Sequence, residues 1–531
     1  MKEHEKGYRG HIAVVAALYS LNSIAWVATS YFTGAMIDHA ISGDIGALLL
    51  TALAVFGIYA FSAVSSVVAA HINLIASTGV VAKINNGFVG KLYSGALARF
   101  RRRDDAYYIN MMVTDAINLR RDRYYNLPVV IGAAVGVLAS VGVLVYISPI
   151  IAAASVVFVA APGALAGVFA KMLQKRASEN SAAMEIYTAA VTEAIQGYES
   201  IKLIGVPQRY FARFGKKMEY MLKTMRRHWL AFVTSNRAQM MLGTVLRFGT
   251  LTLGSYLLTL DMITIGGLMA AWMISSGNLS GDLGNFFSTR ATVRGTNSIR
   301  DKFAQVFAET DEIPAGIEIP AVPAIEYKNV SFGFEGADKL YNNFSYKFEP
   351  GRSYAILGES GSGKSSLLKL LLKYYDSYDG EISIGGHDVR AVPESDIYGI
   401  IGVVNQSPFL MNDTLENNVT MFDGDNADIA PLLAELSLTA LAERVGDTPL
   451  GDFGDNISGG ERQRISIART LRKKPRIIIF DEPTTGLDPE NTLLINDYIF
   501  SLKGITRIVI SHDWDDDYLA RFDDIIRLSR E

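Results

Sequence analysis

The sequence of 531 residues contains no cysteine, which excludes disulfide bonds and cysteine-ligated metal centres. Its first part is short of acidic residues: residues 1–310 hold 29 Lys and Arg against 17 Asp and Glu. Residues 311–531 have the opposite balance, 21 against 37. The chain is too long for one compact domain, and this charge asymmetry predicts two domains in different surroundings.

Charged side chains are also missing from long stretches of the first part. No Asp, Glu, Lys or Arg lies between Arg9 and Asp38, between Asp44 and Lys83, or between Arg123 and Lys171. A membrane-spanning helix needs about 20 mostly apolar residues. The alternative, helices buried in a soluble protein, would require one core to take up all of these runs. The pattern therefore predicts an all-α transmembrane domain of six helices, at residues 12–40, 46–78, 127–147, 150–171, 229–259 and 263–288.

Basic residues predict how these helices cross the membrane. The segments 83–123 and 171–227 carry nine and eleven Lys and Arg, whereas the short connections near residues 41, 148 and 261 carry none. Because positive charge favours the cytosolic side, both long segments are expected there. Six crossings then return the chain to the cytosol. The predicted protein is multi-pass, in a bacterial inner or plasma membrane.

Both basic segments are rich in helix-forming residues, and we expect each to continue its flanking membrane helices into the cytosol. Within them, residues 112–122 and 192–205 are the expected points of contact with the C-terminal half.

A few polar residues fall inside the predicted spans. Charge in a bilayer is costly and usually faces a bundle interior or a watery cavity. Such residues either line a path for cargo or make hydrogen bonds between helices, and both interpretations stay open. The residues are His71, Asn73, Arg237, Arg247, Asn278 and Asn285.

The boundary between the two domains is predicted at a proline-rich stretch. Residues 310–324 contain three prolines and show no clear periodicity, which is typical of a linker. The predicted transmembrane domain is therefore 1–309, with its two long cytosolic loops, and the second domain is 325–531.

A phosphate-binding loop opens the second domain. "SYAILG" (353–358) is a predicted strand, "GESGSGKSS" (358–366) a glycine-rich loop, and 364–375 a predicted helix. Strand, G-x-x-x-x-G-K-S and helix together indicate a P-loop in an α/β domain, whose backbone amides hold the phosphates of ATP. Lys364 would reach the β and γ phosphates, and the Ser365 hydroxyl would bind Mg²⁺. The residues expected to hold the nucleotide here are Gly358, Glu359, Ser360, Gly361, Ser362, Gly363, Lys364, Ser365 and Ser366.

The segment "RIIIFDEP" (476–483) supplies the second half of this site. Ile477 to Phe480 are four apolar residues in a row, typical of a buried parallel strand. Asp481 at the end of that strand can hold Mg²⁺ through water. Glu482 can act as general base on the attacking water or position it.

The stretch "NISGGERQR" (456–464) resembles the signature motif of ATP-binding-cassette (ABC) proteins, and further motifs follow in the order of that family. "VVNQSP" (403–408) resembles its Q-loop, "TTGLD" (484–488) its D-loop and "VISHDW" (509–514) its H-loop. The sequence departs from the family at Asp452, where Glu is usual, and at Phe334, where Tyr is commoner.

The resemblance implies a role for each motif. Gln406 would lie near Mg²⁺, His512 would contact the γ-phosphate, and Phe334 would stack on adenine. The signature and D-loop residues would complete the ATP site of a second chain. These residues are Ser458, Gly459, Gly460, Glu461 and Asp488.

One cassette and six spans make half of a transporter of this family's exporter type, so the expected partner is a second copy of the chain, with a heterodimer as the alternative. The expected function is ATP-driven export of a small amphipathic, peptide-like or lipid-like compound. An importer of siderophore-like cargo and an ATP-gated membrane switch without cargo are alternatives. No basic and aromatic stretch suggests that nucleic acid is a partner.

Overall fold

The computed structural model describes residues 5–310, 316–317, 319–320, 323–334, 339–359, 361–423, 428–512 and 515–528. The chain folds as two compact units. The first, the helical unit, comprises residues 1–91 and 106–309; the second, the cassette unit, comprises 92–105 and 310–531. Most of the predicted linker, 310–324, lies outside the described residues.

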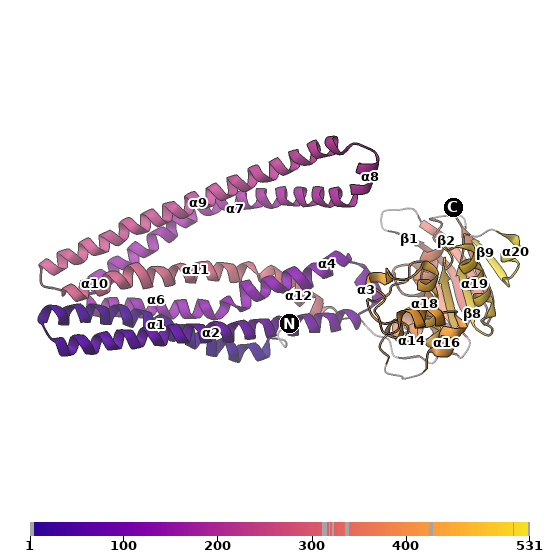
Figure 1. The fold of residues 1–531 in the computed structure, drawn as a ribbon, viewed down its shortest axis with the longest axis horizontal. Helices are drawn as coiled ribbons and strands as arrows, with labels where there is room; N and C mark the ends of the chain where they lie inside the picture. The colour runs from indigo at the N-terminus through magenta and orange to yellow at the C-terminus, as the bar shows by residue number, and fades with distance from the viewer. Residues whose placement is uncertain are drawn as a thin grey trace. The chain divides into compact units, whose positions relative to one another are not determined.

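Long helices build the helical unit (Figure 1). They are α1 (Lys6–Ser42), α2 (Ile45–Tyr93), α6 (Asn126–Ile147), α7 (Pro149–Gln196), α9 (Pro207–Thr259), α10 (Ile265–Met273) and α11 (Ser280–Gly295). A π-helical segment, η3 (Ile274–Leu279), joins α10 to α11. The first five predicted spans each lie within one of these helices. The sixth, 263–288, begins two residues before α10 and continues through η3 into α11. Among the described residues, four helical stretches are long and apolar enough to cross a membrane: 7–42, 45–93, 105–147 and 207–259.

The helices extend well beyond the apolar spans, as expected. α2 continues to Tyr93, α7 to Gln196, and α9 begins at Pro207. Shorter helices complete the unit: α4 (Asp105–Asn110), η1 (Met111–Asp115), α5 (Ala116–Asn118), η2 (Leu119–Tyr124), α8 (Tyr198–Leu203) and α12 (Asn297–Ala308). α7 and α9 lie side by side (Figure 1), and the Tyr210 hydroxyl donates to the Ala190 carbonyl at 3.3 Å.

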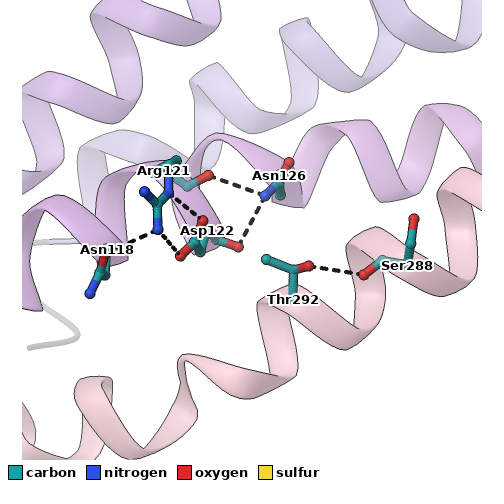
Figure 2. A network of polar contacts seen from close by, with 6 residues as sticks. All are labelled: Asn118, Arg121, Asp122, Asn126, Ser288 and Thr292. Carbon is teal, nitrogen blue, oxygen red and sulfur yellow. Dashed lines mark hydrogen bonds and ion pairs between the residues drawn. The ribbon is translucent and has the colours of Figure 1, made fainter. Parts of the chain in front are cut away.

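Side-chain hydrogen bonds support the helix just before α6, where the backbone is π-helical. Figure 2 shows the amide of Asn126 donating to the carbonyls of Arg121 and Asp122, at 3.1 and 3.2 Å. These carbonyls lie in η2, whose widened turns interrupt the regular α-helical bonding. The Arg121 guanidinium also holds the Asp122 carboxylate at 2.7 Å. The polar side chains thus replace part of the backbone bonding.

The cassette unit contains a segment that the sequence placed in the transmembrane domain. Helix α3 (Leu97–Arg101) lies in this segment, and its Leu97 amide donates to both carboxylate oxygens of Glu394, at 3.1 and 3.2 Å. The Arg102 guanidinium pairs with Asp376, and Arg101 lies over the ring of Tyr374 at 5.8 Å. These backbone hydrogen bonds, the ion pair and the cation–π contact join α3 to the cassette residues.

Residues 92–105 precede the expected boundary at 309, yet they group with the cassette unit. The expected contact at 112–122, a segment of the helical unit, stays a prediction. The expected contact at 192–205 stays a prediction.

Two sheets form the rest of the cassette unit. A parallel sheet has the strand order β6-β7-β8-β3-β9, and an antiparallel sheet has the order β2-β1-β4-β5. The strands are β1 (Ile325–Gly333), β2 (Lys339–Phe348), β3 (Ser353–Gly358), β4 (Asp379–Ile384), β5 (His387–Asp388), β6 (Ile401–Val404), β7 (Ile477–Asp481), β8 (Thr506–Ile510) and β9 (Asp524–Leu528). Every residue of β3 and β8 is buried. Loops that follow β3, β7 and β8 therefore meet at one edge, where ligands of such sheets bind.

Candidate nucleotide-binding site

The glycine-rich loop joins β3 to α13 (Lys364–Leu371), as predicted. Gly361 and Gly363 have φ angles of 82° and 94°, a left-handed conformation that favours glycine. A Cβ atom on Gly363 would also collide with the Tyr341 hydroxyl. The loop thus has the backbone freedom and close packing of a phosphate cradle.

The glycine-rich loop contains two buried polar side chains, Lys364 and Ser362. The Lys364 ammonium donates to the carbonyls of Gly358 and Glu359, at 2.7 and 3.0 Å, and the side chain is only 5% exposed. Burial lowers the pKa of Lys364, and the nearby carboxylates of Glu482 and Asp481 oppose that shift. The buried Ser362 hydroxyl has no hydrogen-bond partner among the described residues. A cation and an unsatisfied hydroxyl in one loop suit a phosphate ligand.

Ser365 and Asp481 come together across the site. The Ser365 hydroxyl donates to the Asp481 carboxylate at 3.1 Å. Burial raises the pKa of Asp481, and the charge of Glu482 adds to that effect, while the Ser365 bond and nearby lysines oppose it. Hydroxyl and carboxylate oxygens are the donors that Mg²⁺ prefers, and a buried carboxylate gains from a cation. The predicted metal-binding pair therefore fits a magnesium ion.

The three predicted catalytic residues meet at Glu482. The Gln406 amide donates to Glu482 Oε2 at 2.8 Å, and His512 Nε2 contacts Glu482 Oε1. Glu482 itself has a φ angle of 48°, which is uncommon for a residue with a side chain and occurs at functional positions. Thr485, which the motifs did not single out, also donates to Glu482 Oε2 at 3.3 Å. Residues from three separate loops thus hold one carboxylate.

Phe334 is exposed, as an adenine platform requires. Its side chain is 46% exposed, and its ring packs edge-on against Phe332 and Tyr375, with centroid distances of 5.3 and 5.6 Å. The two supporting rings were not predicted, because their approach depends on how β1 packs against the end of α13. Ser360 lies outside the described residues.

Tyr341 is a further residue that motif reading missed. Its hydroxyl donates to the carbonyl of Gly363, the last residue of the loop before α13. The side chain is buried on β2, in the antiparallel sheet. Nothing in its sequence position marks this contact, since it requires the two sheets to pack together.

The signature residues form a second group. The Ser458 hydroxyl accepts from the Glu461 amide at 3.2 Å, and the Ser458 amide donates back to Glu461 at 2.8 Å, which caps α18 (Gly459–Arg472). Although burial acts to raise the pKa of Glu461, the bonds from Ser458 and Arg444 lower it. A Cβ atom on Gly460 would collide with Asn491. This tight packing fixes the N-terminus of α18.

Asp488 has a local partner in the structure. It caps α19 (Pro489–Ser501), because its carboxylate accepts from the Asn491 amide at 2.9 Å. Bonds from the Asn491 backbone and side chain lower the pKa of Asp488. A role for Asp488 at a second nucleotide therefore stays a prediction.

Polar residues of the predicted spans make contacts between helices. Arg247 on α9 donates to Ser280 at 3.3 Å, and Asn278 donates to Ser30 on α1 at 3.1 Å. Asn73 donates to the Tyr125 carbonyl at 2.9 Å. These bonds support the structural interpretation of Asn73 and Asn278, and a cargo-lining role for Arg247 stays open to test.

Asp282 was overlooked, although it is an acidic residue inside the predicted span 263–288. A Cβ atom on Gly136 would collide with its carboxylate, and Ser23 lies beside the same point. The Asp282 carboxylate therefore lies where α1, α6 and α11 meet. A charged residue inside a predicted membrane span is the sequence signal that could have identified Asp282.

Comparison with known proteins places both units in one family. Residues 12–281, half of the chain, match the ABC transporter transmembrane region, and residues 341–485 match the ABC transporter family. ATP-binding cassette sub-family B member 6 from Xenopus tropicalis is 35% identical over 39% of this chain and 26% of its own length. The ATM1-type heavy metal exporter from Novosphingobium aromaticivorans is 28% identical over 61% of this chain and 55% of its own length. This chain thus spans about a quarter and about half of these two relatives.

A solved structure shares the fold of the whole chain. The structure of a bacterial Atm1-family ABC exporter with ATP bound has a TM-score of 0.81 at 21% identity, covering 99% of this chain and 93% of that chain. The site is that of a P-loop ATPase, and the helical unit is a transmembrane region. The chain belongs to the ABC transporters, with both parts fused in one polypeptide.

We predict that Asp481→Asn stabilises the protein while it abolishes ATP hydrolysis. A raised pKa in the folded state means that ionised Asp481 costs folding free energy at neutral pH, a cost that disappears as the pH falls below the folded pKa. The variant should unfold at a higher temperature at pH 7, by about 2–4 °C for each kcal/mol relieved. Thermal unfolding of the full chain without nucleotide measures this.

The matched control is Asp379→Asn, which changes an exposed carboxylate of the same unit. Exposed ion pairs contribute little, so its unfolding temperature should not change. A lower unfolding temperature for Asp481→Asn would contradict the assigned cost of burial.

We also predict that Tyr341→Phe weakens ATP binding. Loss of the hydroxyl removes one of the two hydrogen bonds that the Gly363 carbonyl accepts, and the bond from the Leu367 amide at 3.0 Å remains. The lost bond costs about 0.5–1.5 kcal/mol, or a two- to tenfold higher Kd. Tyr346→Phe is the control, because Tyr346 lies on the same strand but donates to Asp524. Titration with a fluorescent ATP analogue compares the two, and equal affinities would remove Tyr341 from the site.

Proposed function

We propose that two copies of this chain form an ATP-driven transporter that exports a small amphipathic or lipid-like compound. The observation that carries the proposal is the meeting of Gln406 and His512 on the carboxylate of Glu482. The same edge of the sheet holds Lys364 and the pair of Ser365 with Asp481. Membership in the ABC transporters makes the helical unit the part that this chemistry would drive.

Each residue has a proposed role in hydrolysis. The loop amides and the N-terminus of α13 bind the phosphates, and Lys364 shifts from the loop carbonyls to the β and γ oxygens. Ser365, Asp481 and Gln406 hold Mg²⁺, which neutralises developing charge when bound. Glu482 orients the attacking water and accepts its proton.

The bonds that now surround Glu482 fit this role. Because Gln406 and His512 occupy its two oxygens, the carboxylate is held in one orientation by groups from the loops after β6 and β8. His512 can turn from Glu482 to the γ-phosphate once nucleotide is present. Phe334, exposed and backed by two rings, stacks on the adenine.

The partner is proposed to be a second copy of the chain. Ser458, Gly459, Gly460 and Glu461 lie at the N-terminus of α18, where backbone amides favour an anion. In the dimer they, with Asp488, close over the ATP of the other chain. ATP then binds the closed pair of cassettes more tightly than the open pair, and this difference shifts the helices between two states. A heterodimer is the alternative outcome.

Export is favoured over import by one of the relatives, which is named as a heavy metal exporter. The test of direction is reconstitution in vesicles, with ATP supplied on the cassette side and a panel of compounds followed by accumulation. Accumulation inside vesicles that carry outward-facing cassettes supports export. Accumulation in the opposite direction supports an importer, and ATP hydrolysis with no compound moved supports a membrane switch.

We predict that Glu482→Gln retains ATP binding and loses most turnover, with a fall of about 10²–10³-fold or more. Glutamine keeps the shape but cannot accept a proton, so ATP should trap the closed dimer. ATPase assays and retained nucleotide after gel filtration measure the two effects. Glu490→Gln, on the exposed first turn of α19, is the control and should hydrolyse ATP normally. Full turnover in Glu482→Gln would remove it as the base.

A mixed dimer tests whether the site is shared. Ser458→Arg blocks the signature of one chain, and Lys364→Ala removes the phosphate ligand of the other. If each site uses Lys364 of one chain and Ser458 of its partner, the mixture retains one intact site, whereas each variant alone has none. About half of the normal ATPase rate, or less if the sites cooperate, is expected in tagged and purified mixed dimers. Identical inactivity of mixed and unmixed dimers would contradict a shared site.

A further inference from the structure

One end of the helical unit is tied together by short connections. Residues 43–44 join α1 to α2, Ser148 joins α6 to α7, and residues 260–264 join α9 to α10. Figure 1 shows the turns after α1 and after α9 at the same end of this unit. This is the end without Lys or Arg in its connections, and it is outermost in the predicted orientation. Helices joined by such turns cannot separate there, so an outward opening must break contacts between the three hairpins.

The contact of α1 with α10 is such a contact between hairpins. The Gly266 amide donates to Asp38 Oδ1 at 2.8 Å, and the Thr264 hydroxyl donates to Asp38 Oδ2 at 2.6 Å. A carboxylate from α1 therefore caps the first turn of α10. The N-terminus of a helix attracts negative charge, and bonds to an ionised acceptor are stronger than neutral ones.

The contact of α1 with α10 and η3 forms a seam, and the rest of this seam is built from small and polar residues. A Cβ atom on Gly34 would collide with the Gly266 carbonyl, so the two backbones touch at this point. Further along, the Asn278 amide donates to Ser30 at 3.1 Å. Small residues and interhelical hydrogen bonds hold membrane helices together without interlocking large side chains. Such a seam can come apart and form again with little repacking.

We propose that Asp38 is a positioning residue for transport, which latches the outer end of α1 onto α10 and must release for the protein to open outward. This rests on the proposed function, because only alternating access requires the outer end to open. The latch stabilises the outward-closed state in the absence of ATP. Closure of the cassettes on ATP is then coupled to loss of the two bonds to Asp38.

The chain offers a matched control for this residue. Asp44 is also an aspartate that caps a helix, since its carboxylate accepts from the Ala47 amide at 2.9 Å. That bond caps the N-terminus of α2 inside the first hairpin, so it cannot latch two hairpins. Asp38→Asn replaces one acceptor oxygen by an amide that cannot accept, and Asp44→Asn makes the same change outside the seam.

Cysteine cross-linking measures the seam directly, because the chain has no cysteine of its own. The pair Ser30→Cys with Asn278→Cys bridges the two hairpins, and Asn22→Cys with Ser62→Cys bridges α1 to α2 within one hairpin. Both pairs are oxidised in membranes, with and without ATP, in the Glu482→Gln background that retains nucleotide. We expect ATP to lower the yield of the first pair and to leave the second unchanged.

Asp38→Asn should lower the yield of the first pair even without ATP. The closed-to-open ratio is expected to fall about tenfold, the order of effect for losing a charge-assisted hydrogen bond. ATPase activity should persist while transport per ATP falls, a split that a merely unstable variant would not show. Asp44→Asn should match the unaltered chain in all three measurements.

Different results would contradict the Asp38 latch and the proposed function. A first-pair yield that ATP does not change would overturn the latch, because the contact of α1 with α10 would then persist when ATP is bound, whereas ATP hydrolysis without movement of any compound in the vesicle experiment would overturn the proposed function. If ATP lowers the yield but Asp38→Asn behaves like Asp44→Asn, the latch alone is wrong. Should Asp38→Asn not reach the membrane, Thr264→Val removes one of the two bonds from the other side and should shift the ratio in the same direction.

Discussion

The hydrogen bond between Ser365 and Asp481 joins the two halves of the nucleotide site, and the rest of the cassette is arranged to make it possible. Ser365 follows the loop after β3, and Asp481 ends β7, with β8 between the two strands. Parallel pairing brings the carboxyl ends of these strands to one edge. The buried strands supply the rigidity, and the loops supply the charge. Everything proposed for hydrolysis depends on this edge staying in register.

The burial that supports this edge also has a cost. Asp481 is a buried acid. Its raised pKa shows that the bond from Ser365 and the nearby lysines do not fully offset the cost of burying its negative charge. Glu482 adds a second carboxylate with an unusual backbone angle. Sites that concentrate like charge and strain are stabilised by the surrounding fold, and they gain most when a cation binds. Stability and function are therefore in conflict at this point in the cassette.

The helical unit solves a different physical problem. In a bilayer, apolar side chains give no preference for neighbouring helices over lipid, so close backbone approach and hydrogen bonds hold the helices together. Gly34 against Gly266, and Asn278 on Ser30, are contacts of this kind. The segment 92–105 differs, because it groups with the cassette unit, where the Arg102 guanidinium pairs with Asp376.

The sequence alone determined the elements whose signal is local. Charge-free runs located the helices, and the glycine-rich loop with Lys364 and Ser365 located the phosphate cradle, because backbone freedom and residue chemistry there follow from neighbours in the chain. Only the tertiary structure decided that Tyr341 supports the loop, that residues 92–105 join the cassette, and that Asp38 caps α10. These contacts join residues that are far apart in the sequence, and they form only when sheets and helices pack together. A local pattern of residues carries no information about such long-range packing.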